Sequence, residues 1–203
     1  IIGNSTQLVV MSGIFGMITV IVSERRMGTL PQLTICPTNN VIIFYGRSFV
    51  MIFDGLTSVI AGFAAGGLLF HIDFSNVKWL CLITTLIITS FSVSALGLLL
   101  GMMGLIGTDL NLLLNIALSV LLVLCGVNFP VEEFPTAVQF LAQLLPLKHG
   151  LMAVRNIFEG QLDNVLHYLG LEALVGGCYM IIGYFMFYYV ERMAREKGTL
   201  SLE

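Results

Sequence analysis

Few polar side chains interrupt the apolar stretches of this chain, and these are the residues that can do chemistry. Asp54 stands in a long apolar run, and a carboxylate inside a membrane is by default a functional candidate that faces a cavity or a partner. It also lies two turns beyond Arg47 on about the same helical face, roughly 10 Å further in. We favour snorkelling or pairing with Arg47 near the interface, with a place on a substrate path as the alternative.

A stripe of hydroxyl side chains follows the i, i+4, i+7 spacing of one helical face at Thr85, Thr89 and Ser92. Hydroxyls can hydrogen-bond across helices inside a bilayer. We favour this packing role over the alternative that the stripe lines a path for substrate. Two pairs of glycines spaced four residues apart allow close helix approach, either within the subunit or between two subunits: Gly62 with Gly66, and Gly97 with Gly101.

The remaining reactive residue types show no arrangement for catalysis or metal binding. The sequence has no HExxH, GxSxG or paired-aspartate motif and no GxxxxGK[ST] phosphate loop. The histidines lack a second ligand at metal spacing and are interpreted as solvated loop residues: His71, His149 and His167. The cysteines are interpreted as small buried hydrophobes: Cys36, Cys81, Cys125 and Cys178. Asp109 and Glu172 are placed at crossing ends, where a charge can reach headgroups, with no assigned role.

The composition indicates that the elements carrying these residues lie in a membrane. Of the 203 residues, 57% are hydrophobic and 10% are charged, whereas soluble domains carry about 25% charged residues. The formal net charge of −3 is small and mixed in sign. This charge pattern excludes the concentrated basic face that nucleic acid requires.

Runs of roughly 20 apolar residues are long enough to cross a bilayer, and several are present. We therefore predict an all-α integral membrane protein, a polytopic helical bundle with five visible crossings. These crossings cover residues 1–22, 48–70, 79–103, 112–129 and 168–190. Because the chain starts with Ile1 rather than Met, we expect a protein of six crossings whose N-terminal helix is missing here.

The distribution of Lys and Arg orients the crossings, because positively charged loops stay in the cytoplasm. Alternate loops place Arg25, Arg26, Arg47, Arg192, Arg195 and Lys197 on one side, and Lys78, Lys148 and Arg155 on the other. The first side is therefore expected to be cytoplasmic, and it includes the C-terminus.

The cytoplasmic segment 24–37 holds more than a connection needs. It contains a Thr-x-x-Gln capping box, with Pro31 suited to a first helical turn and Pro37 disfavouring further helix. The pattern predicts a short helix over about 30–35, with Leu30 and Leu33 on one side. Such a helix either docks in a cleft of a cytoplasmic partner or lies on the membrane surface; both interpretations stay open.

The outer segment 130–167 also predicts helices. Pro135 can open a helix that is apolar on nearly every face, and Pro146 ends it. A second helix is predicted at about 148–158, with Gly160 as its C-terminal stop. Both helices are too short to span, so we expect a re-entrant pair in the outer leaflet, packed against protein.

These two segments resemble the type 2 export permease family, the membrane-spanning subunits of ATP-binding-cassette (ABC) exporters. A family pattern near ERExGTLExLxxxP is represented by Glu24, Arg25, Arg26, Gly28, Thr29, Leu30, Leu33 and Pro37. A second, near LPLxYxxxALRxxxxG, is represented by Phe129, Pro130, Pro135, Gln139, Pro146, Leu147, Arg155 and Gly160. The chain departs from the patterns at Arg26, Pro31 and His149. The resemblance implies one transmembrane permease domain over residues 1–203.

The resemblance also implies partners. The short helix over 30–35 would be a coupling helix that receives the stroke of a separate cytoplasmic ABC ATPase, with Glu24 and Arg25 placed to pair with it. ATP and Mg²⁺ would be held by that ATPase, and no cofactor by this chain. A second permease subunit would complete a homodimer or heterodimer.

We therefore expect an ATP-driven exporter in the plasma membrane of a prokaryotic cell, not an enzyme. A hydrophobic or amphipathic substrate, such as a drug, an antibiotic or a lipid-linked molecule, suits a transport pathway with so few fixed charges. The expected function is therefore similar to that of multidrug exporters. The alternative is a secondary transporter or channel that works without an ATPase. It would need ionisable residues near mid-bilayer, where only Asp54 comes close, and matching halves.

Overall fold

The structure is a computed structural model, and it describes residues 2–26, 40–70, 77–105, 110–127 and 134–197. Every regular element among these residues is an α-helix, which confirms the all-α prediction. The helices are α1 (Ile2–Arg26), α3 (Asn40–Phe70), α4 (Trp79–Leu105), α5 (Leu110–Leu124), α6 (Thr136–Leu144), α7 (Lys148–Phe158) and α8 (Val165–Lys197).

Three of the described helices are long and apolar enough to cross a membrane, in α1, α4 and α8. Their apolar windows are Thr6–Ser23, Trp79–Met103 and Val165–Tyr189. Shorter apolar stretches occupy Phe53–Gly66 of α3 and Leu112–Leu124 of α5. The five predicted crossings therefore remain a prediction for α3 and α5.

The predicted fourth crossing, 112–129, is longer than the helix found there. Helix α5 has 15 residues, which span about 22 Å, less than the roughly 30 Å of a hydrocarbon core. The helix ends at Leu124 and the backbone leaves helical geometry at Gly126, whose φ of +80° is a left-handed conformation open to glycine.

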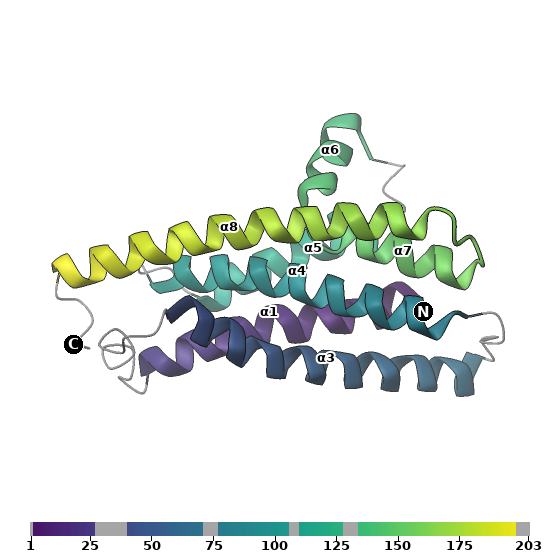
Figure 1. The fold of residues 1–203 in the computed structure, drawn as a ribbon, viewed down its shortest axis with the longest axis horizontal. Helices are drawn as coiled ribbons and strands as arrows, with labels where there is room; N and C mark the ends of the chain where they lie inside the picture. Colours follow the sequence, from purple (N-terminus) through teal and green to yellow (C-terminus); the bar gives the residue numbers. More distant parts are fainter. Residues whose placement is uncertain (1, 27–39, 71–76, 106–109, 128–133, 198–203) are drawn as a thin grey trace.

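The long helices lie side by side (Figure 1). Helix α4 packs between α1 and α8, which run in the same direction as α4, and α3 packs chiefly on α1 in the opposite direction. Their buried side chains form two apolar clusters. One joins α3, α4 and α7 through Phe63, Leu86 and Val154. The other joins α1, α4 and α5 through residues such as Ile14, Val93 and Leu121. The clusters place α4 and α7 at the centre of the fold.

Small residues allow α4 to approach α1 closely. A Cβ added to Gly97 would lie 3.1 Å from the Cβ of Met17 and 3.2 Å from the Cα of Ile14. A Cβ at Gly101 would collide with the side chain of Ile21. This pair of glycines therefore serves packing within the subunit.

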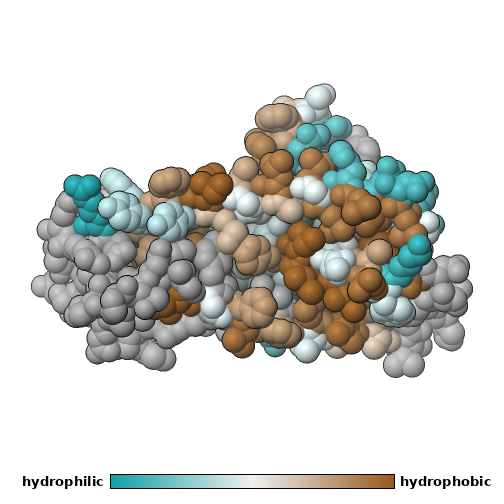
Figure 2. Space-filling model, viewed as in Figure 1, coloured by the Kyte–Doolittle hydropathy of each residue, from teal (hydrophilic) through white to brown (hydrophobic). Residues whose placement is uncertain are grey.

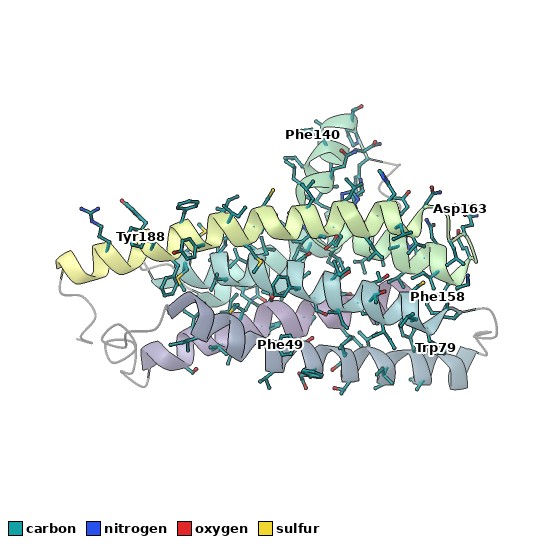
Figure 3. All side chains as sticks on the ribbon, viewed as in Figure 1. Phe49, Trp79, Phe140, Phe158, Asp163 and Tyr188 are labelled. Carbon is teal, nitrogen blue, oxygen red and sulfur yellow. The ribbon has the colours of Figure 1, made fainter. Side chains whose placement is uncertain are left out.

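The exposed surface is largely apolar, as a lipid-facing protein requires. Figure 2 shows apolar residues across the middle of one face and hydrophilic residues toward both ends. Trp79 lies near one end of the bundle and Tyr188 near the other (Figure 3). Both are exposed, and amphipathic aromatic rings gather at the two membrane interfaces. This spacing agrees with a bundle that stands across a bilayer.

The two helices predicted within segment 130–167 begin and end near the predicted residues but differ in burial. Pro135 is the N-cap of α6 and Leu145 its C-cap, and α7 ends before Gly160, whose φ is +76°. Helix α6 projects from the bundle (Figures 1 and 3), and Ala142 is its one buried residue. The expectation of packing against protein thus holds for α7, which buries six residues, and fails for most of α6.

Candidate functional site

Among the acidic residues whose side chains the structure describes, Glu172 of α8 is the one that is completely buried, with 0% of its surface exposed. The sequence-based interpretation placed it at a crossing end where it would reach headgroups, and this interpretation is wrong. Helix α8 begins at Val165, so Glu172 lies about 10 Å along it. At that depth the side chain points into the subunit, between α4 and α7.

Both oxygens of the Glu172 carboxylate accept hydrogen bonds from the start of α7. The backbone N–H of Leu147 donates to Oε1 at 2.9 Å, and that of Gly150 donates to Oε2 at 3.0 Å. The first amides of a helix have no partner within the helix, and a side chain at the N-cap usually satisfies one. Leu147 is the N-cap of α7 and carries no such group. Glu172 therefore caps α7 from another helix.

The carboxylate also meets the positive end of the α7 dipole, which favours a negative charge. No ion pair to Glu172 occurs among the residues that the structure describes. The backbone at Leu147 has a φ of +93°, which is strained for a residue with a Cβ. The strained N-cap and the two hydrogen bonds occur together at a single junction, which we call the Glu172 junction: Leu147, Gly150 and Glu172.

Helix α4 completes this junction with the hydroxyl stripe. The Ser92 hydroxyl donates to the backbone oxygen of Glu172 at 3.1 Å. A Cβ added to Gly150 would lie 2.8 Å from Cγ2 of Thr89. A Cβ added to Gly176 would lie 2.9 Å from the Cα of Ser92. Helices α7 and α8 therefore approach α4 too closely at these two glycines for any larger residue.

The hydroxyl stripe is buried along its whole length: Thr85, Thr89 and Ser92. Thr85 and Thr89 donate to carbonyls one turn earlier in α4, at 2.7 and 2.9 Å. Within this subunit the stripe faces protein. The Ser92 hydroxyl bonds to α8 as the packing interpretation expected, whereas the hydroxyls of Thr85 and Thr89 bond within α4. A role on a substrate path stays a prediction.

His149 is buried rather than solvated, contrary to expectation, with 8% of its surface exposed. Its Nε2 lies 3.2 Å from the backbone oxygen of Gln143, and its ring stacks on that of Tyr168 with centroids 6.5 Å apart. Burial lowers the pKa of His149, since water no longer stabilises the charged ring. His167, by contrast, is exposed as expected.

Arg155 ties the far end of α7 to the end of α5. Its guanidinium donates to the backbone oxygen of Gly126 at 2.6 Å. Carbonyls at a helix C-terminus lack partners within the helix, and Arg is a strong charged donor. The Arg of the second family pattern thus holds two helices together.

The other predicted site residues are not brought to this junction. Asp54 is exposed on α3, and the Thr57 hydroxyl donates to its backbone oxygen at 2.8 Å. The pairing of Asp54 with Arg47 is not tested, because the Arg47 side chain lies outside the described residues. Asp54 is therefore exposed, whereas the hydroxyl stripe is buried inside the bundle.

The predicted coupling residues lie at the end of α1 or beyond it. Glu24, Arg25 and Arg26 are the last residues of α1, and their side chains are not described. The other predicted coupling residues lie outside the described residues: Gly28, Thr29, Leu30 and Leu33. The coupling helix therefore stays a prediction.

The cysteines divide by burial. Cys125 is buried, Cys81 is half-buried and Cys178 is exposed, all with free thiols. The prediction that the cysteines are small buried hydrophobes is therefore confirmed for Cys125 and wrong for Cys178. Cys36 lies outside the described residues.

Long apolar helices, a lipid-compatible surface and a junction built for packing define a multi-pass helical membrane protein. No cluster of three or more metal-ligating side chains occurs in the described parts of the chain. The family pattern of the ABC-2 family transporter proteins matches residues 3–185. The chain belongs to this family of ABC transporter permeases, which confirms the resemblance. The matched region is a transport permease domain, not an ATPase.

No curated protein and no solved structure matches the chain.

Proposed function

We propose that this chain is the membrane-spanning subunit of an ATP-driven exporter, working as a dimer with two copies of a cytoplasmic ABC ATPase. The observation that carries the proposal is the family match over residues 3–185. The sequence holds no phosphate loop, so a separate ATPase supplies the energy. ATP and Mg²⁺ belong to that partner.

The coupling site in this proposal is segment 24–37, at the cytoplasmic end of the bundle. The end of α1, the start of α3 and the C-terminal end of α8 lie at the same end of the molecule (Figure 1). That end carries Arg25, Arg26 and Arg192, in keeping with the tendency of positive charges to stay in the cytoplasm. A stroke delivered there would reach α1, α3 and α8 together.

The substrate in this proposal is hydrophobic or amphipathic, such as a drug, an antibiotic or a lipid-linked molecule. The apolar surface of α3 exposes Phe49, Phe53 and Ile60 beside the carboxylate of Asp54. A charge in contact with lipid tails is costly. The exposed carboxylate therefore supports a position of this face on a substrate cavity or against the second subunit, rather than against lipid.

The membrane arrangement is part of the proposal. It places the protein in a prokaryotic plasma membrane with the C-terminus in the cytoplasm, a side that the distribution of Lys and Arg supports. The exposed apolar residues of α6, among them Phe140, Leu141 and Leu144, suit insertion into the outer leaflet.

The test is to purify the full-length protein from its native membrane and to measure ATP hydrolysis by what accompanies it. We expect an ABC ATPase to co-purify, with hydrolysis that responds to the amphipathic cation ethidium. Glu24→Gln and Arg25→Gln should each lower that response at unchanged yield of folded permease. Asp163→Asn, an exposed acidic residue at the opposite end (Figure 3), is the matched control.

The alternative function, a secondary transporter or channel, predicts a different result. The permease would then purify without any ATPase, and ethidium movement would follow an ion gradient. That outcome would contradict the proposal.

A further inference from the structure

We infer that Glu172 is a positioning residue that makes the start of α7 move with α8, so that movement at the cytoplasmic end of α8 reaches the outer helical loop. The inference rests on the proposed function, because it needs a stroke delivered from the cytoplasmic side. It assigns a role to a residue that neither family pattern contains.

Glu172 attaches the start of α7 firmly to α8. Two oxygens on one carboxylate hold two backbone amides, at 2.9 and 3.0 Å. Two hydrogen bonds to the two oxygens of one carboxyl group fix its orientation as well as its distance from the start of α7. A loss of this acceptor would leave both amides buried without a partner, since α7 offers no side-chain cap of its own.

Helix α8 is long enough to connect the two ends of the bundle. It runs for 33 residues from Val165 to Lys197 without interruption, about 50 Å at the rise of an α-helix. Glu172 lies near one end, and Arg192 lies near the other. A continuous helix of this kind can carry a displacement from the ATPase side to the outer side.

Helix α7 is held by different elements at its two ends. At its start, Glu172 of α8 binds the backbone. At its other end, Arg155 binds the carbonyl of Gly126 after α5, at 2.6 Å. If α8 moves relative to α5, the two attachments pull on opposite ends of α7, and the helix must tilt. Tilting of α7 would change the outer helical loop that α6 and α7 form.

The packing at Gly150 explains how such a tilt can occur. The three nearest atoms that a Cβ added there would meet all belong to the side chain of Thr89, which can rotate, whereas a backbone contact could not yield. The hydrogen bonds to Glu172 then decide which neighbour the start of α7 follows.

The experiment measures distances between spin labels in the complex of the full-length permease with its ATPase. In a background in which the native cysteines are replaced by alanine, one pair is placed at Lys148 and Leu174, across α7 and α8. A second pair is placed at Lys148 and Leu80, across α7 and the outer end of α4. Leu174 and Leu80 are exposed, and Lys148 is half-buried. Each pair is measured without nucleotide and after trapping with ATP and vanadate.

In the parent protein, the Lys148 to Leu174 distance should stay the same in both states, while the Lys148 to Leu80 distance should change. In Glu172→Gln, the first distribution should broaden or split, and the second should lose at least half of its response. ATP hydrolysis should stay within twofold of the parent. A residue that served stability alone would not separate hydrolysis from outer movement. Asp163→Asn should behave as the parent.

The two failures can be told apart. If no ATPase binds, or the parent shows no response at either pair, the proposed function fails. If the parent responds and Glu172→Gln responds equally, the inference is overturned while the function stands. Glu172→Asp, which keeps the charge on a shorter side chain, carries the test if the glutamine variant does not accumulate. If neither accumulates, Glu172 serves folding alone, and the inference is also overturned.

Discussion

Replacing Gly176 with alanine should destabilise the bundle, although the same change is usually favourable in a helix. The added Cβ would lie 2.8 Å from the Cβ of Ser92 and 2.9 Å from its Cα, and would collide with its hydroxyl. A side chain can rotate away from such a contact, but a backbone atom cannot. Helices α4 and α8 would have to separate where they pack most closely.

The size of the effect follows from three contributions. Overpacking a well-packed site costs about 1–3 kcal/mol, and a backbone contact places Gly176 in the upper part of this range. The hydrogen bond from Ser92 to the oxygen of Glu172, 3.1 Å long, contributes about 1 kcal/mol that separation would remove. Alanine regains about 0.5–1 kcal/mol relative to glycine within a helix. The expected net loss is about 3 kcal/mol.

Gly177 provides the matched control, because it is the next residue of the same helix and an added Cβ would meet nothing within 4 Å. Gly177→Ala should therefore leave stability unchanged or raise it by up to about 1 kcal/mol. The free energy of unfolding of both variants is measured by titration with dodecyl sulfate in mixed micelles, with circular dichroism as the readout. Equal shifts in the two variants would refute the close approach of α8 to α4.

Three further variants test the other contacts. Gly150→Ala should cost about 1–3 kcal/mol in the same titration. Adding Thr89→Ala should recover part of the loss, because the three nearest atoms that a Cβ at Gly150 would meet are side-chain atoms of Thr89. Strictly additive effects in the double variant would contradict this contact. Arg155→Gln should cost about 1.5–3 kcal/mol by freeing the carbonyl of Gly126, whereas Lys78→Gln, at an exposed lysine, should cost little. In the folded chain, burial holds the pKa of His149 below its ordinary value of 6.5. As pH drops below about 6.5 the unfolded chain therefore gains the proton first, and the stability of the fold falls. His149→Gln should flatten this dependence of stability on pH, and an unchanged dependence in that variant would contradict the role of His149.

Local patterns predicted most helices because their signals are local. Pro146 and Gly160 flank α7, and the helix found there lies within these limits. The Pro135 start of α6 was predicted for the same reason. The end of α5 was predicted five residues too late, since an apolar run continues past Gly126 although the helix does not.

The Glu172 junction could not be predicted by local patterns, because it joins residues 22 and 25 positions apart. Glu172 was placed at a crossing end because it lies only four residues inside the predicted crossing 168–190. His149 was placed in solvent because it lies in segment 130–167, outside the predicted crossings. One signal was present in the sequence: the predicted helix at 148–158 begins after Leu147, with no Ser, Thr, Asp or Asn to cap it. A buried helix start without a cap requires an acceptor from elsewhere, and an acidic residue in the next apolar run supplies one.

The proposal that a separate ATPase drives this permease depends on transport that needs both proteins. It is tested most directly by ethidium movement in inside-out vesicles that contain the full-length permease with and without its ATPase, in the presence of a proton ionophore. We expect ATP-dependent accumulation of ethidium only when both proteins are present, and no effect of the ionophore. Movement that needs no ATP and is abolished by the ionophore would contradict it.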